Sequence, residues 1–324
     1  MLTRRRLAVA MAATPAAPAL SRAQGAGWPA DRPIEVIVPY PPGGGVDVMA
    51  RMAVQFAPQY LPGARFVVVN RAGAGGQLGF EAMFNVVPDG YTLGSVAVPA
   101  INTFPLERPV RYRPLDFTFL ANVVDDPNTI YVTDNSPLRT LQDLLQVARQ
   151  RPGQMNYGTT GVGSDDHILM LTLEGMAGLQ PMTHVPFVGA APLLAQVLGG
   201  HIEVGVGNMA EILASLRDGR VRALGQAGAL RWDAAQDVPT FREQGYDIVA
   251  GSSRGIVGPP ELPDVIRNRL EQTFQAVLAD PGFLRDAERV SLPLRPLVGP
   301  DYRRMVEQTD RTVQSLWQQR PWSR

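Results

Sequence analysis

The sequence contains no cysteine and no lysine, so all 30 residues counted as lysine plus arginine are arginines. Without cysteine the chain has no disulfide, no thiol nucleophile and no thiolate metal ligand. Without lysine it can use neither a Schiff base nor a Walker-type phosphate-binding lysine. The formal net charge of 0 lacks the basic excess that is typical of nucleic-acid-binding proteins. A ligand could still be bound by backbone groups, hydroxyls, carboxylates and arginines.

Histidines and long apolar runs are also scarce. The histidines are His167, His184 and His201, and they lie far apart with no metal-site spacing. We therefore predict no metal and no cofactor, and we expect His184 and His201 to be structural residues at strand ends. Beyond the N-terminus no stretch approaches the roughly 20 apolar residues that a membrane span requires.

The N-terminus predicts export. Three arginines at positions 4–6 precede an apolar run over residues 7–20, and a small-x-small site ends at Ala23. The run is too short to span a membrane, and prolines interrupt it. We predict a signal peptide over residues 1–23 and a mature protein in the periplasm. Residues 3–7 also resemble a twin-arginine signal, and the choice between the two export routes stays open.

Residues 34–51, IEVIVPYPPGGGVDVMAR, combine a β-branched strand, a proline and glycine loop, and the start of a helix. Such a loop presents unpaired N–H groups at the positive end of a helix dipole, where a phosphate or carboxylate binds. The loop matches neither the Walker nor the dinucleotide pattern. A tight turn without any ligand is the alternative interpretation.

The same order of strand, small-residue loop and helix recurs along the chain. Loops of this kind occupy residues 71–79, 98–102 and 160–164, each after a predicted strand. Repeated in this way, the pattern predicts an α/β protein with ligands at the carboxyl ends of its strands. We further expect a strand, loop and second strand over residues 119–132, a helix over 237–245 and a crossing strand within 248–258. The expected architecture is two hinged α/β lobes, each a mostly parallel sheet flanked by helices.

Eight motifs in fixed order identify a family. They are VPYPPGGGVDVMAR, VVVNRAGAGGQLG, PDGYTLG, NYGTTGVGSDDH, HVPFVGAAPLLAQVLGGHIEV, GRVRALG, DVPTFREQGYD and GIVGPPELP. Together they resemble the periplasmic substrate-binding proteins of tripartite tricarboxylate transporters, the Bug receptors. The resemblance covers essentially the whole mature chain.

This resemblance implies a type II periplasmic-binding fold that closes like a Venus flytrap. It implies one lobe from residues 32–131 and 252–324 and a second lobe from residues 132–251. It further implies a monomeric receptor, not an enzyme, that captures a small carboxylate and delivers it to a permease driven by an ion gradient. Carried over by position, the ligand-binding residues are Gly44, Gly45, Asp47, Ala74, Gly75, Asn102, Thr159, Thr160, Gly163, Ser164, His167, Ala190 and Asn208.

Three departures from the family pattern concern the ligand. Asp165 and Asp166 stand where hydroxyl residues are usual, Gly207 replaces an aspartate, and a Phe-Val pair at 187–188 replaces Tyr-Lys. We favour the interpretation that both aspartates face solvent. If one faces the cleft, the ligand carries an amine or lacks a second carboxylate. A less polar cleft favours a monocarboxylate or an aromatic or amphipathic acid.

Two other functions remain open. The same fold could serve as a periplasmic sensor for a signalling kinase, because no motif marks the docking surface. Ser164, Asp166 and His167 are the residue types of a hydrolytic triad, but they are nearly adjacent and no GxSxG turn is present. Arg254, on the expected crossing strand, is the arginine that we expect nearest the cleft.

Overall fold

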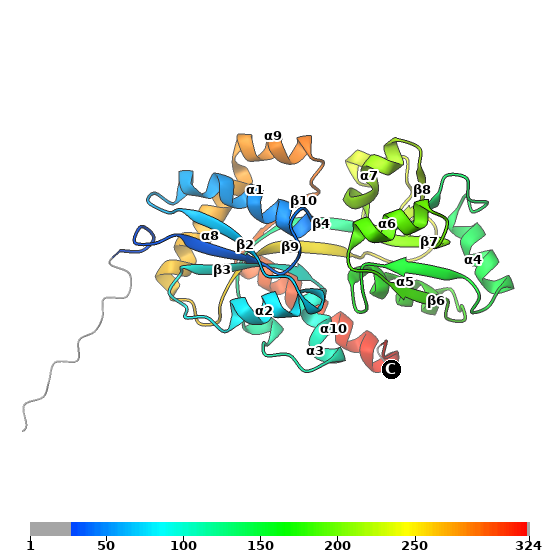
Figure 1. The fold of residues 1–324 in the computed structure, drawn as a ribbon, viewed down its shortest axis with the longest axis horizontal. Helices are drawn as coiled ribbons and strands as arrows, with labels where there is room; N and C mark the ends of the chain where they lie inside the picture. The colour runs from blue at the N-terminus through cyan, green and yellow to red at the C-terminus, as the bar shows by residue number, and fades with distance from the viewer. Residues whose placement is uncertain (1–26, 323–324) are drawn as a thin grey trace, which may run out of the picture.

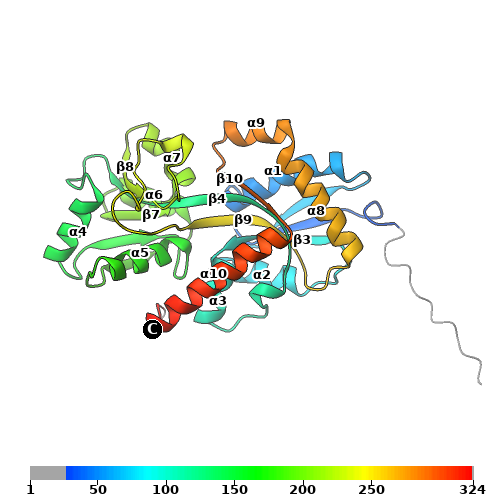
Figure 2. The same cartoon turned by 180° about the vertical axis from the view of Figure 1, so that it is seen from behind.

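The computed structural model describes residues 27–322, so the predicted signal peptide lies outside the described residues. Figures 1 and 2 show two lobes joined by two long neighbouring strands, β4 (Thr118–Thr133) and β9 (Gly251–Gly258). The predicted lobe boundaries at 131/132 and 251/252 fall within these strands. None of the described helices is both long and apolar enough to cross a membrane.

The larger lobe is built on a mixed sheet. Its parallel strands are β2 (Phe66–Asn70), β1 (Ile34–Val38) and β3 (Thr92–Val98), in that spatial order. Antiparallel β9 lies between β3 and β4, and β10 (Leu294–Val298) pairs with β4. The helices of this lobe are α1 (Gly45–Tyr60), α2 (Gln77–Phe84), α3 (Ala100–Glu107), α8 (Asp264–Ala279), α9 (Pro281–Arg289) and α10 (Pro300–Gln319).

The smaller lobe continues the sheet from the far half of β4. Strand β7 (Val204–Asn208) pairs with β4 and is followed in space by parallel β5 (Asn156–Thr159) and β6 (Thr183–Pro186). Strand β8 (Val221–Gln226) also pairs with β4. The helices are α4 (Leu141–Gln150), α5 (Asp165–Met176), α6 (Ala190–Leu198) and α7 (Met209–Arg217).

Each lobe has its own hydrophobic core. The largest cluster of buried apolar side chains draws on residues between 34 and 124 and between 256 and 306, and the next on residues between 130 and 248. In α1 the apolar face packs into the larger core, because Met49, Ala53 and Ala57 are fully buried. The predicted α/β fold class is therefore confirmed, with the parallel order interrupted in each lobe by a crossing strand.

Three predicted elements differ from the structure. Residues 119–132 form one continuous strand within β4, because β9 pairs with its first part and β7 and β8 with its second. Residues 237–245 do not form a helix, since Thr240 bridges to Gln226 and its N–H donates to Glu243. The loop expected over 98–102 gives way to α3, whose Ile101 and Phe104 are buried in the larger core.

Candidate functional site

The glycine loop before α1 is held by a side chain that we expected to contact the ligand. Asp47 is buried, and its carboxylate accepts hydrogen bonds from the Gly43 N–H (2.9 Å), from Arg51 (3.0 Å) and from Asn70 (2.8 Å). Burial opposes its ionisation, but these hydrogen bonds outweigh burial and lower its pKa. Asp47 thus fixes the loop while Gly44 and Gly45 begin the helix beside it.

Arg254 connects the two lobes at this loop. It extends from β9, is buried, and lies against Gly45 so closely that a Cβ atom there would be 2.1 Å from Nη1. Its guanidinium donates to Asn208 Oδ1 (3.1 Å) and forms ion pairs with Asp126 (3.3 Å) and Glu211 (3.5 Å). Arg254, the arginine suspected near the cleft, thus lies at the junction of the lobes.

Several carboxylates surround Arg254, and our interpretation that Asp165 and Asp166 both face solvent is wrong. Asp166 is fully buried and accepts from the Thr160 N–H (3.0 Å) and hydroxyl (2.5 Å). Asp165 is half-buried, and its Oδ2 accepts from Asn128 Nδ2 (2.6 Å) and Asn208 Nδ2 (2.8 Å). These amide and hydroxyl donors replace water and allow the acidic groups to be buried.

Burial shifts the ionisation of this cluster. It raises the pKa of Asp126 to about 7, despite the neighbouring Arg254 charge and a hydrogen bond from the Ala210 N–H. Burial also raises the pKa of Asp166 and of Glu211. These carboxyl groups therefore take up protons more readily in the folded chain than in the unfolded chain.

Asp126 gives a pH prediction. Its pKa is raised from about 3.9 in an unfolded chain, so its contribution to stability is complete below about pH 4 and is lost as the pH rises through about 7. Asp126→Asn cannot ionise. We expect its melting temperature to fall less than that of the unmodified protein between pH 5 and pH 8. The exposed Asp134→Asn controls for the loss of a charge, and parallel profiles for the protein and Asp126→Asn would contradict the prediction.

The lobes also meet where α3 approaches the loop before α5. The Thr103 hydroxyl donates to the Gly163 carbonyl (2.8 Å), and a Cβ atom on Gly163 would be 1.7 Å from a Glu107 oxygen. Beyond α10, Trp322 donates to the same Glu107 carboxylate (2.6 Å), and Arg320 bonds Glu174 of α5 (2.6 Å). The contacts of Thr103 with Gly163 and of Arg320 with Glu174 join the lobes on the side of α10, and the bond from Trp322 to Glu107 holds the C-terminal segment to α3 beside them.

The predicted residues of the smaller lobe mostly stabilise their own loop. Ser164 caps α5 by accepting from the His167 N–H (3.3 Å), and His167 Nδ1 accepts from the Gly163 N–H (3.2 Å). The His167 ring stacks on His184, which bonds Thr159 (2.7 Å). In the described part of the chain no hydrogen bond joins the Ser164 hydroxyl to a histidine ring, so the geometry does not form a hydrolytic triad.

The remaining predicted residues make their contacts elsewhere in the two lobes. Asn102 turns toward α10, where it donates to Asp310 (3.0 Å). Ala74 and Gly75 form the positive-φ turn before α2, and the next residue, Gly76, faces the Tyr40 ring. Ala190 begins α6 and is half-buried.

The prediction missed Asp126, Asn128 and Glu211, which contact Arg254 or the aspartates beside it. The only local signal was the run of polar residues DDPN within an otherwise apolar strand. Because this run lies within an apolar strand, its polar side chains could have been recognised as buried hydrogen-bond or ion-pair partners of a charged residue.

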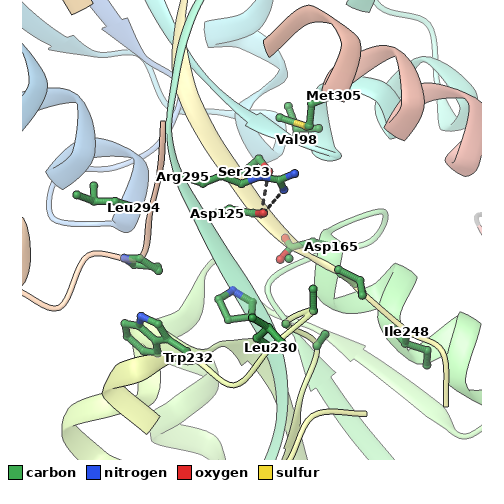
Figure 3. Close-up of a pocket in the computed structure, with 18 of the residues that line it drawn as sticks. Val98, Asp125, Asp165, Leu230, Trp232, Ile248, Ser253, Leu294, Arg295 and Met305 are labelled. Carbon is green, nitrogen blue, oxygen red and sulfur yellow. Dashed lines mark hydrogen bonds and ion pairs between the residues drawn. The ribbon is translucent and has the colours of Figure 1, made fainter. Parts of the chain in front are cut away.

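A recess of about 1550 Å³ follows the hinge beside this cluster. Figure 3 shows Asp165 between Val98 and Met305 on one side of the recess and Leu230 and Trp232 on the other. None of the predicted ligand-binding residues lines it, although Asp165 adjoins them through Asn208. The recess therefore reaches the polar junction from the side of α10 and β10.

Two lobes joined by crossing strands, with helix N-termini facing each other at the junction, define the class of periplasmic binding proteins. The chain belongs to the tripartite tricarboxylate transporter receptor family, whose model matches residues 49–315. It is 31% identical to protein BugT of Bordetella pertussis over 76% of this chain and 77% of that one. The predicted family and fold are therefore confirmed.

Two similar solved structures contain carboxylates. An R. palustris protein with adipate has a TM-score of 0.81 at 27% identity, with 90% of this chain and 97% of that one covered. MatC from Rhodopseudomonas palustris, with bound malate, has a TM-score of 0.73 at 25% identity, with 90% and 98% covered.

Proposed function

We propose that this protein is an exported solute receptor that captures a small carboxylate between its lobes and delivers it to a tripartite tricarboxylate-type permease. In this proposal residues 1–23 are removed on export, and the mature chain works as a periplasmic monomer without catalysing a reaction. The observation that carries the proposal is the meeting of the α1, α5 and α7 N-termini around Arg254 and Asn208. Helix N-termini favour anions.

We propose that backbone N–H groups and hydroxyls of the predicted residue set hold one ligand carboxylate. Gly44, Gly45 and the turn at Ala74 and Gly75 would contribute from the larger lobe, and the Ser164 hydroxyl and the Ala190 N–H from the smaller. Arg254 already bonds protein acceptors, so it offers no unpaired cation to a second carboxylate. This supports the preference for a monocarboxylate or an amphipathic acid.

Thermal unfolding of the chain from Gln24 onward tests the proposal. The panel contains mono-, di- and tricarboxylates, amino acids and the amide of each acid. A ligand at 100 times its dissociation constant adds about 2.7 kcal/mol to stability, which corresponds to a rise of several degrees in the melting temperature. We expect an acid to raise the midpoint and its amide to leave it unchanged. A panel without any responding acid would refute the carboxylate receptor, and tight binding of citrate would refute the monocarboxylate preference.

A further inference from the structure

Carboxyl groups outnumber basic groups around Arg254 at the lobe junction. Arg254 supplies a positive charge at this junction. Four carboxyl groups interact with it electrostatically, those of Asp126, Glu211, Asp165 and Asp166. Arg254 bonds Asn208 and Ser252 and pairs with Asp126 and Glu211, so its charge is already compensated within the protein. Arg217, Arg289 and Arg295 also line the recess that Asp165 reaches. A purely anionic ligand at Asp165 itself would nevertheless add negative charge beside an arginine, Arg254, that is already paired.

The unmet hydrogen-bonding capacity of the junction belongs to acceptors. Asn128 is fully buried, and its Oδ1 has no hydrogen-bond partner among the described residues. Asp126 is also fully buried, but its Oδ2 lies 3.3 Å from Arg254 Nη1 and is therefore paired. The other end of the Asn128 amide donates to Asp165 and Asp166, so this side chain lies against the same carboxylates. Acceptors without partners require a donor, and an ammonium group offers three N–H donors where a carboxylate offers none.

Asp165 is the carboxylate that a ligand can reach. Two amides hold its Oδ2, whereas no hydrogen bond to Oδ1 is found within residues 27–322. It is half-buried and lines the recess together with the apolar Val98, Pro99 and Ile168 (Figure 3). An ion pair is stronger in such a partly desolvated place than at an open surface.

We propose that the ligand carries an ammonium group that binds Asp165, so that the receptor selects an amino carboxylate, with one positive and one negative end, over a simple organic acid. This inference rests on the proposed receptor function, in which the glycine loops hold the carboxylate end. Gly45, Arg254, Asn208 and Asp165 are in successive contact, which places the proposed ammonium site in the same polar junction as the glycine loop before α1.

A metal ion is a weaker candidate than an ammonium group for the positive charge that binds Asp165. Within the described residues, no group of three or more His, Cys, Asp or Glu side chains is arranged to hold a metal ion. Arg254 also stands among the carboxylates and would repel a divalent cation.

Calorimetric titration with matched ligands tests the inference. Each pair shares a carbon skeleton with and without the amino group, for example alanine with propionate, 4-aminobutyrate with butyrate and 6-aminohexanoate with hexanoate. A charge-assisted hydrogen bond contributes enough that we expect the best amino acid to bind at least about tenfold more tightly than its amino-free partner. Asp165→Asn keeps the shape of the side chain and should remove this difference.

The matched control is Asp264→Asn. Asp264, like Asp165, is the first residue of its helix, but it lies exposed on α8. We expect this variant to retain the full preference for the amino ligand. If Asp165→Asn proves unstable, the comparison of matched ligands on the unmodified protein still shows whether the amino group strengthens binding.

Different results separate the inference from the proposed function. If acids without an amino group bind as tightly as their amino partners, the ammonium inference is overturned and the receptor function stands. If Asp165→Asn keeps the preference, Asp165 is not the ammonium site and the inference is also overturned. If neither member of any pair binds, the carboxylate receptor itself fails.

Discussion

Replacing Arg254 with methionine is expected to lower the free energy of unfolding by about 3–5 kcal/mol, the usual cost of leaving a buried charge without its partner. Arg254 and Asp126 are both almost fully buried, and Glu211 also depends on the same guanidinium. Methionine fills much of the space but supplies neither charge nor donors. Urea unfolding followed by circular dichroism measures the loss.

Measurements at a lower pH and on a control variant show whether the buried ion pair causes this loss of stability. The loss should shrink at pH 5, where Asp126 is protonated, and Asp126→Asn introduced together with Arg254→Met should recover part of the stability. Arg242→Met is the control, since Arg242 pairs with Asp247 (2.6 Å) at an exposed position and such pairs contribute about 0–1 kcal/mol. Equal losses for the two arginine variants would contradict a buried bridge between the lobes.

Replacing Gly163 with alanine is expected to weaken ligand binding by about tenfold or more, because the closed, binding-competent arrangement becomes costlier to form. A Cβ atom at this position would lie 1.7 Å from a Glu107 oxygen, so α3 and the loop before α5 would have to move apart. That movement would also strain the hydrogen bond from Thr103 to the Gly163 carbonyl. Calorimetry with the best acid from the panel measures the affinity.

Gly178→Ala is the matched control for backbone strain. Gly178 has φ +61° against +70° for Gly163, but nothing lies within 4 Å of the position of its added Cβ atom. Both variants should lose about 1–2 kcal/mol of stability from the left-handed backbone, and only Gly163→Ala should lose affinity. Adding Glu107→Ala to Gly163→Ala should restore part of that affinity. Equal affinities in the two glycine variants would show that this contact does not govern closure.

The sequence was most informative where local chemistry determines structure. The glycine loop was recognised before α1, and Thr140 at the start of α4 and Asp165 at the start of α5 are likewise hydroxyl and acidic residues of the kind that favour helix N-termini. These signals act between residues that are close together in the chain. They are therefore sufficient to place the glycine loops at the ends of strands.

The polar junction could not be predicted in the same way, because its partners are distant in sequence. Asp126 in β4, Glu211 in α7 and Arg254 in β9 meet only when the lobes are assembled. For the same reason DDPN looked like a loop, although pairing with β9 and β7 keeps it extended. Asp47 and His167 follow the loops closely in the chain, but hydrogen-bond partners that the sequence does not reveal direct their side chains toward the loop backbone.

The opposite positions of the two chain ends affect how the protein should be labelled. The segment that leads into β1 lies at the outer end of the larger lobe, whereas α10 ends beside the smaller lobe, where Arg320 and Trp322 bond Glu174 and Glu107 (Figure 1). An affinity tag or fluorescent reporter fused beyond α10 would therefore stand at the contact between the lobes and change the affinity being measured. A tag placed before residue 27 is remote from that contact.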